Sequence, residues 1–248
     1  MLGPVRRNLF SERLCDNAAM LEAASCEFES IFYAHDGLPS DKWHHYLAVY
    51  DRHVGAVRDR RRRADPDDGV RLLEIGVMRG GSLEVWRRYL GPSAIIHGLD
   101  IDETCEKHED RPDLVVHIGD QKNEGLLERI ATEMGGLDVV VDDGGHFSSD
   151  QIRTFEALYP LLASDGVYVC EDTHTSYWPE YGGSLKHPRS FIEYAKDLVD
   201  HIHAWHADGV IGDAFARATS GVFFYDSMVV VERGDRRPPR RAIVGQPR

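Results

Sequence analysis

The chain has 248 residues, with 29 basic and 42 acidic side chains and a formal charge of −13. This balance disfavours nonspecific binding to nucleic acid or to anionic membranes, so a small or neutral partner is expected. No run approaches the ~20 apolar residues of a membrane span, and the first residues lack the apolar core of a signal peptide. We therefore expect a cytoplasmic protein without a membrane partner.

Residues 1–65 are expected to form an N-terminal helical region. Apolar residues recur at helical spacing in two stretches that are separated by a break containing glycine and proline. Ser40 or Asp41 is a suitable N-cap for the second helix. Trp43 and Tyr46 lie in that helix, and their spacing favours core positions over contacts with a cofactor.

From residue 70 onward the sequence alternates between strands and helices. Predicted strands at 70–76, 94–100, 113–120, 137–143 and 166–172 alternate with helices at 82–89, 123–134 and 149–162. Such alternation predicts an α/β fold with a doubly wound, mostly parallel sheet and right-handed crossovers.

Two further apolar runs within residues 221–234 are separated only by Asp226 and Ser227, which predicts a C-terminal antiparallel hairpin. A parallel sheet closed by such a hairpin is typical of the Rossmann-like class I methyltransferases. The expected organisation is a domain at 66–233 after the N-terminal helical extension, followed by a polar tail at 234–248.

The first turn between a strand and a helix contains Gly76 and Gly80, but Met78 replaces the second glycine of the dinucleotide fingerprint. The next strand ends in Asp100, which is well placed to accept hydrogen bonds from ribose hydroxyls. An acidic ribose contact without a pyrophosphate cradle favours S-adenosylmethionine as the cofactor. The predicted contacts with this donor are Glu74, Gly76, Gly80, Ser82, Asp100, Asp120, Gln121 and Asp142, with Asp120 and Gln121 placed near the adenine.

Two other strands are expected to end in acidic pairs at the same edge of the sheet. One apolar run ends in Asp142 and Asp143, and the other ends in Glu171 and Asp172. Because carboxylates gathered at one edge repel one another, a divalent cation with oxygen ligands is the simplest explanation for them. His146 follows shortly after the first pair and is a candidate general base beside such an ion.

Together these segments resemble the metal-dependent sugar O-methyltransferases of bacterial natural-product pathways, such as the mycinamicin-type enzymes and the rhamnosyl O-methyltransferases often labelled cephalosporin hydroxylase. The resemblance covers about residues 41–232, and its specific part is the pair of motifs DDGGH and EDTHTSYW. It implies a magnesium ion bound by Asp143, Glu171 and Asp172, with His146 as the general base.

The segment 173–188 is rich in aromatic residues, glycine and proline, as expected of a lid that stacks on a sugar. Its candidate acceptor contacts are His174, Tyr177, Trp178 and Tyr181.

The expected activity is therefore the Mg²⁺-dependent methylation of a hydroxyl on a sugar or glycoside, by a protein that forms a homo-oligomer. Two alternatives remain, a metal-dependent oxygenase and a noncatalytic module that binds a nucleoside or a sugar. A site with three carboxylates and one histidine disfavours an iron oxygenase, which uses two histidines and one carboxylate. A base beside a metal has no use in a pure binding module.

Overall fold

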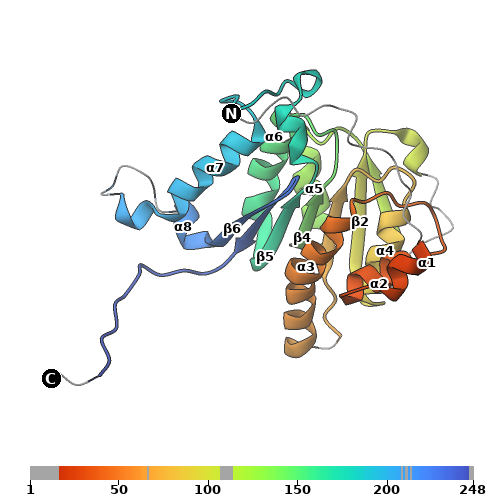
Figure 1. The fold of residues 1–248 in the computed structure, drawn as a ribbon, viewed down its shortest axis with the longest axis horizontal. Helices are drawn as coiled ribbons and strands as arrows, with labels where there is room; N and C mark the ends of the chain where they lie inside the picture. The colour runs from red at the N-terminus through yellow and green to blue at the C-terminus, as the bar shows by residue number, and fades with distance from the viewer. Residues whose placement is uncertain are drawn as a thin grey trace.

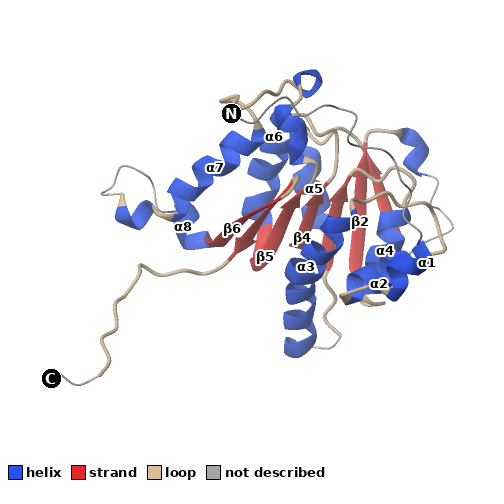
Figure 2. Ribbon diagram, in the orientation of Figure 1, coloured by secondary structure: helices blue, strands red, loops and turns tan. Residues whose placement is uncertain are grey.

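The computed structural model describes residues 17–65, 67–106, 114–207, 209, 212 and 214–245. One twisted sheet lies at its centre, with strand order β3-β2-β1-β4-β5-β7-β6 (Figures 1 and 2). The pairs among β1 to β5 are parallel, whereas β7 runs antiparallel to both β5 and β6. The strands are β1 Arg71–Ile75, β2 Ile95–Asp100, β3 Leu114–Ile118, β4 Leu137–Asp142, β5 Leu162–Cys170, β6 Thr219–Tyr225 and β7 Met228–Arg233.

Helices cover both faces of this sheet (Figure 2). The α-helices are α1 Asn17–Glu22, α2 Glu27–Tyr33, α3 His44–Ala64, α4 Gly81–Leu90, α5 Glu124–Glu133, α6 Ser148–Leu158, α7 Phe191–Ile202 and α8 Ala214–Ala218. Short 3₁₀ turns occur at Glu103–Glu106, Tyr159–Leu161, Thr173–Tyr177, Pro179–Tyr181 and Ala204–His206. None of the described helices is long and apolar enough to span a membrane.

Successive residues of each buried strand point to opposite faces and enter two separate hydrophobic clusters. Leu72 of β1 packs in the cluster that includes α2, α3 and α4, and Leu73 packs in the cluster that includes α5, α6 and α7. The predicted doubly wound sheet with its C-terminal hairpin is therefore confirmed.

The N-terminal helical region does not form a hydrophobic core of its own. Buried residues of α3 share one cluster with β4 and β5, so the predicted boundary at residue 65 marks a change of secondary structure within a common core. Arg61 near the end of α3 also donates to Asp138 of β4, a carboxylate that is fully buried. Residues 1–16 lie outside the described part of the chain.

The start of α3 differs from the prediction. The helix begins at His44 with Trp43 at the N-cap position, so neither Ser40 nor Asp41 caps it. The residues before Trp43 lie outside the helix, and they carry Lys42 into the interior, where its side chain is 6% exposed. The expectation that Trp43 is a core residue is also wrong, because it is 41% exposed, whereas Tyr46 is buried as expected.

Two other differences have local causes. The helix predicted over 149–162 ends at Leu158, since Pro160 cannot continue it, and β5 starts at Leu162. Helix α7 was not predicted, although it buries Phe191 and other apolar residues at helical spacing. The polar tail leaves the body of the protein after contacts near Arg236 (Figure 1).

Candidate active site

The acidic strand ends meet at the carboxyl edge of the sheet, where β4 and β5 lie side by side. The two members of the first pair have different environments. Asp142 is 1% exposed and accepts hydrogen bonds from Tyr168 Oη at 2.9 Å and Gln121 Nε2 at 3.3 Å, whereas the Asp143 side chain is 22% exposed. Burial raises the pKa of Asp142 to about 7, against the lowering effect of the Tyr168 hydrogen bond. Asp143 alone of this pair faces the site.

The turn after β1 fits closely against the backbone of β4. Gly76 has a φ of +88°, and a Cβ atom at this position would lie 2.0 Å from the carbonyl oxygen of Asp143. Only glycine allows this approach. Met78 also adopts a left-handed conformation, with a φ of 50°, so the turn keeps a glycine-like shape at the position where the dinucleotide fingerprint has glycine.

Asp100 holds this turn in place. Its Oδ2 accepts hydrogen bonds from the backbone N–H groups of Val77 at 2.8 Å and Met78 at 3.0 Å, and its Oδ1 accepts from Asp102 at 2.9 Å. The predicted contact with a ribose would use the remaining lone pairs of the same carboxylate. The side chain therefore lies at the predicted donor site and also shapes it.

Two other predicted donor residues face each other inside the protein. Ser82 Oγ donates to Glu74 Oε2 at 2.6 Å, and Glu74 is fully buried. Burial raises the pKa of Glu74, although the nearby Lys42 opposes the shift. Both side chains shape the wall behind the turn, while Gly80 caps α4 in a left-handed conformation.

The third strand end has a different geometry from the one predicted. Both donor positions of the Gln121 amide are used, by Asp142 and by Thr154 Oγ1 at 2.9 Å, and its Oε1 accepts from Gly145 N at 2.8 Å. Gln121 therefore braces the turn through Gly145. Asp120 is partly exposed, and its contact with adenine stays a prediction.

Asp143, His146 and Asp172 form a group that can hold a cation. One ligand atom from each lies within 4.8 Å of the other two. His146 Nε2 lies 3.7 Å from Asp172 Oδ2, and His146 Nδ1 is buried without a hydrogen-bond partner among the described residues. Carboxylate oxygens with an unpaired imidazole nitrogen suit a divalent cation.

Two residues of this group have left-handed backbone conformations, which set the directions of their side chains. His146 has a φ of 57° and Asp172 a φ of 51°, values that non-glycine residues seldom adopt. Thr175 Oγ1 ties the two loops together, since it donates to the carbonyl oxygens of both His146 at 2.8 Å and Asp172 at 2.9 Å. The surrounding structure thus holds both residues in place.

Glu171, the third predicted metal ligand, is paired with Lys42 instead of joining this group. Lys42 Nζ lies 2.6 Å from Asp143 Oδ2 and 3.0 Å from Glu171 Oε2, and it is 3.5 Å from Glu74 Oε1. Tyr50 Oη also donates to Glu171 at 2.5 Å. Direct ligation by Glu171 therefore stays a prediction, and it requires a rearrangement of these contacts.

Lys42 supplies one positive charge to three carboxylates. Burial by itself would lower the pKa of Lys42, but the charges of Asp143 and Glu171 outweigh it and raise the pKa, so the ammonium stays protonated. Burial, followed by the charge of Asp143, raises the pKa of Glu171, against the lowering effect of Lys42.

The face of α3 that follows Lys42 reaches the acidic pair after β5, Glu171 and Asp172. Tyr46 Oη donates to Asp172 Oδ1 at 2.7 Å, and Tyr50 lies one helical turn further on. Sequence reasoning missed the roles of Lys42 and Tyr50. The only signal was their spacing, since positions 42, 46 and 50 place polar atoms four residues apart beside an apolar helix face.

Aromatic side chains border one side of the cluster. The ring of His174 lies 4.5 Å from that of Trp178 and 6.2 Å from that of Trp43, and Trp178 lies 6.1 Å from Tyr181. Tyr177 is 42% exposed in the same segment. The rings of His174, Trp178 and Tyr181 thus lie next to one another, with Trp43 beside His174, and their contact with an acceptor stays a prediction.

Known proteins resemble the chain in both sequence and structure. It is 34% identical over 209 residues to 8-demethyl-8-alpha-L-rhamnosyl tetracenomycin-C 2'-O-methyltransferase of Streptomyces olivaceus, a match over 78% of this chain and 52% of the relative. It is 39% identical over 204 residues to mycinamicin VI 2''-O-methyltransferase of Micromonospora griseorubida, over 77% of this chain and 48% of the relative. Both relatives are O-methyltransferases by name, and the chain is similar to each of them over most of its own length.

Among solved structures, the MycE methyltransferase of the mycinamycin biosynthetic pathway, in complex with Mg, SAH and mycinamycin VI, has a TM-score of 0.69 and 31% identity. The match covers 90% of this chain and 54% of that one. This likeness confirms the class I methyltransferase fold. The chain spans about half the length of the curated relatives it matches. No family model matches it.

The buried ammonium generates a stability prediction. Lys42→Met should lower the free energy of unfolding by about 3 to 5 kcal/mol in metal-free protein, because it leaves buried carboxylates without their partner. Lys122→Met is the matched control, since its ammonium bridges Asp120 and Asp150 and is 44% exposed, and it should cost less than about 1 kcal/mol. Urea denaturation measures both variants. Equal stability of the two would show that Lys42 has no such role.

Proposed function

We propose that the chain methylates a hydroxyl of a sugar carried by a glycoside, with S-adenosylmethionine as the methyl donor and Mg²⁺ as the metal. The observation that carries the proposal is the convergence of Asp143, His146 and Asp172 at the carboxyl edge of a class I methyltransferase sheet. The likeness to MycE, a structure that contains Mg and SAH, supports both cofactors.

The donor would lie beside the turn after β1. A small cavity there is lined by Gly76, Met78, Ser82 and Asp143, together with residues 39–42. Asp100 holds the turn and presents its remaining lone pairs for ribose hydroxyls. The donor supplies an electrophilic methyl group on a sulfonium when it is bound. The adjoining Asp143 links this cavity to the candidate metal ligands.

Asp143 and Asp172 would hold the magnesium ion, together with water, since this ion prefers oxygen ligands and usually keeps several waters. When bound, it supplies a Lewis acid that lowers the pKa of an acceptor hydroxyl. Lys42 keeps Glu171 and Asp143 oriented from the opposite side. Glu171 is the further ligand that we expect if Lys42 shifts.

His146 would take the proton of the acceptor hydroxyl at Nε2. This atom faces Asp172, whose carboxylate would stabilise the imidazolium that forms. The same nitrogen cannot bind a cation and accept a proton at once. Nε2 can therefore act as the base or as a metal ligand, but not as both. Removal of the His146 side chain should lower metal affinity only if it is a ligand.

The aromatic residues beside the cluster would bind the sugar ring. His174, Trp178 and Tyr181 lie in the loop after β5, and exposed Trp43 faces them from the start of α3. Aromatic faces pack against the apolar faces of sugars without fixing the hydroxyl pattern. These residues support a glycoside acceptor but leave the choice of hydroxyl to the metal and the base.

The two alternatives are less well supported. An iron oxygenase requires two histidines and one carboxylate, whereas this group has two carboxylates and one histidine. A module that only binds a ligand does not require His146 and Asp172 to be held in rare backbone conformations beside Asp143. We also propose that the protein is cytoplasmic, forms a homo-oligomer and binds neither nucleic acid nor membranes, in keeping with its charge of −13.

Metal removal tests the first element of the proposal. Chelation should abolish transfer of a labelled methyl group from S-adenosylmethionine to a panel of rhamnosides and related glycosides, and excess Mg²⁺ should restore it, because the ion offsets the charge of Asp143 and Asp172. Mass spectrometry of the products measures the transfer. Undiminished turnover in excess chelator would remove the metal from the mechanism.

Asp100 tests the placement of the donor. Asp100→Ala should weaken S-adenosylhomocysteine binding by roughly 10-fold or more, since a hydrogen bond to a charged group contributes about 1.5 to 3 kcal/mol. Calorimetry measures the affinity. Asp102→Ala is the matched control, because that carboxylate is exposed and accepts from Thr104 N at 2.8 Å. If both variants bind alike, the donor lies elsewhere.

His146 tests the assignment of the base. His146→Ala should lower kcat by roughly 100-fold or more while the affinities for Mg²⁺ and S-adenosylhomocysteine stay nearly unchanged. A loss of Mg²⁺ affinity in calorimetry would instead identify His146 as a ligand. Near wild-type turnover would exclude both roles and point to His174.

A further inference from the structure

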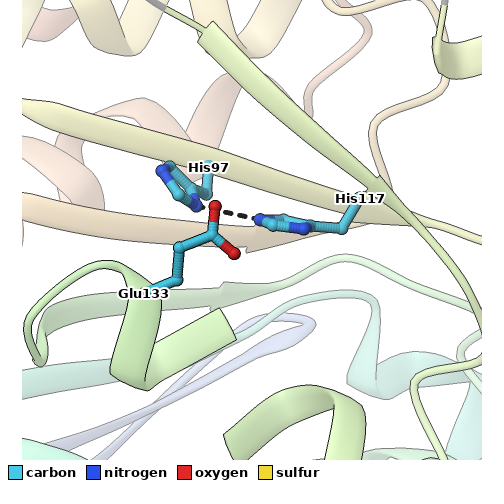
Figure 3. A group of neighbouring side chains, drawn as sticks. All are labelled: His97, His117 and Glu133. Carbon is cyan, nitrogen blue, oxygen red and sulfur yellow. Dashed lines mark hydrogen bonds between the residues drawn. The ribbon is translucent and has the colours of Figure 1, made fainter. Parts of the chain in front are cut away.

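Two histidines and a glutamate converge near the β3 edge of the sheet, which is the edge opposite the hairpin, next to the end of α5 (Figure 3). His97 comes from β2, His117 from the edge strand β3, and Glu133 is the last residue of α5. The carboxylate cluster lies instead at the ends of β4 and β5. The three residues therefore form a second, separate group.

The strand register places both imidazoles on one face of the sheet. His97 lies opposite Val115, so His117, two residues further along β3, is its diagonal neighbour on that face. His97 Nδ1 lies 2.9 Å from His117 Nε2, and one ligand atom from each of the two histidines and Glu133 lies within 4.8 Å of the others. Figure 3 shows the Glu133 carboxylate directed toward this pair of nitrogens.

The histidine pair is neutral at physiological pH. Burial, followed by the charge of His117, lowers the pKa of His97 to about 4, and burial lowers the pKa of His117 as well. Neutral imidazole is the form that binds metals. One of the two facing nitrogens carries the proton of this hydrogen bond, and metal binding would require that ring to take its other tautomer, with the proton on the nitrogen that faces away.

We propose that His97, His117 and Glu133 form a binding site for a transition-metal dication such as Zn²⁺. Two nitrogens and one carboxylate with an open fourth position form a known ligand set for zinc, and nitrogen ligands disfavour Mg²⁺. At metal–nitrogen distances of about 2.0 to 2.1 Å, two nitrogens of a tetrahedral site lie about 3.3 Å apart. The two rings therefore need to separate by only a few tenths of an ångström.

The ion has a route to the site and a structural consequence there. His97 is 7% exposed, but His117 is half-buried and Glu133 is exposed, so the open position faces solvent. A bound ion would join the edge strand β3 to both β2 and α5. Edge strands are otherwise held from one side only, so the ion would stabilise this end of the sheet.

Cobalt binding tests the proposal on the whole, metal-stripped chain in excess Mg²⁺, which occupies the carboxylate cluster. Co²⁺ should bind with one equivalent and give the visible absorption of a four-coordinate site, and Zn²⁺ should displace it. His117→Gln should weaken binding by more than about 100-fold, because even the loss of a supporting residue costs 10- to 100-fold. Glu133→Gln, a change at an exposed position, should weaken it by roughly 10-fold or more.

Two controls locate the bound ion. His203→Gln removes a histidine outside the group, one that bonds to the Val199 carbonyl oxygen, and Asp172→Asn removes a ligand of the carboxylate cluster. Both variants should keep the cobalt spectrum and the Zn²⁺-induced rise in Tm, which His117→Gln should lose. The proposal is overturned if wild-type protein gives no saturable spectrum, or if the spectrum survives both His117→Gln and Glu133→Gln.

Discussion

The ammonium of Lys42, enclosed by carboxylates, is the interaction on which the rest of the site depends. Glu74, Asp143 and Glu171 come from three places in the chain, and each lies within 3.5 Å of this one atom. In the low-dielectric interior these charges would repel strongly without it. Lys42 thus joins the wall of the donor cavity to the candidate metal ligands.

The architecture could be predicted because each strand and each crossover helix has its own pattern of apolar residues within a short stretch of sequence. Buried parallel strands need apolar, β-branched runs, and their polar ends identify the edge at which a ligand binds. Asp143, His146 and Asp172 come together for this reason, although they follow different strands. The hairpin was equally predictable, since the two residues between its strands leave no room for a crossover.

The partners of these residues could not be predicted, because they arise from contacts between distant segments. Lys42 precedes Glu171 by more than a hundred residues, and no local pattern relates the two. Gln121 and Asp142 were correctly placed at strand ends, but their side chains bond to each other, and neither lines the cavity beside the turn after β1. The alternation of apolar and polar residues along a strand predicts which face of the sheet each side chain occupies. It does not predict the direction of the side chains of the last one or two residues, where the strand ends.

Helix α3 links the site to the stability of the whole molecule. Tyr46 binds Asp172, Tyr50 binds Glu171, and His53 binds Glu232 of β7 at 2.7 Å, all along one face of the helix. A local opening that freed α3 would break all three contacts and expose the apolar face beneath it. Because these contacts lie on one face of the helix, α3 cannot separate from the sheet without breaking the hydrogen bonds that orient Glu171 and Asp172, so the packing of this helix and the geometry of the site depend on each other.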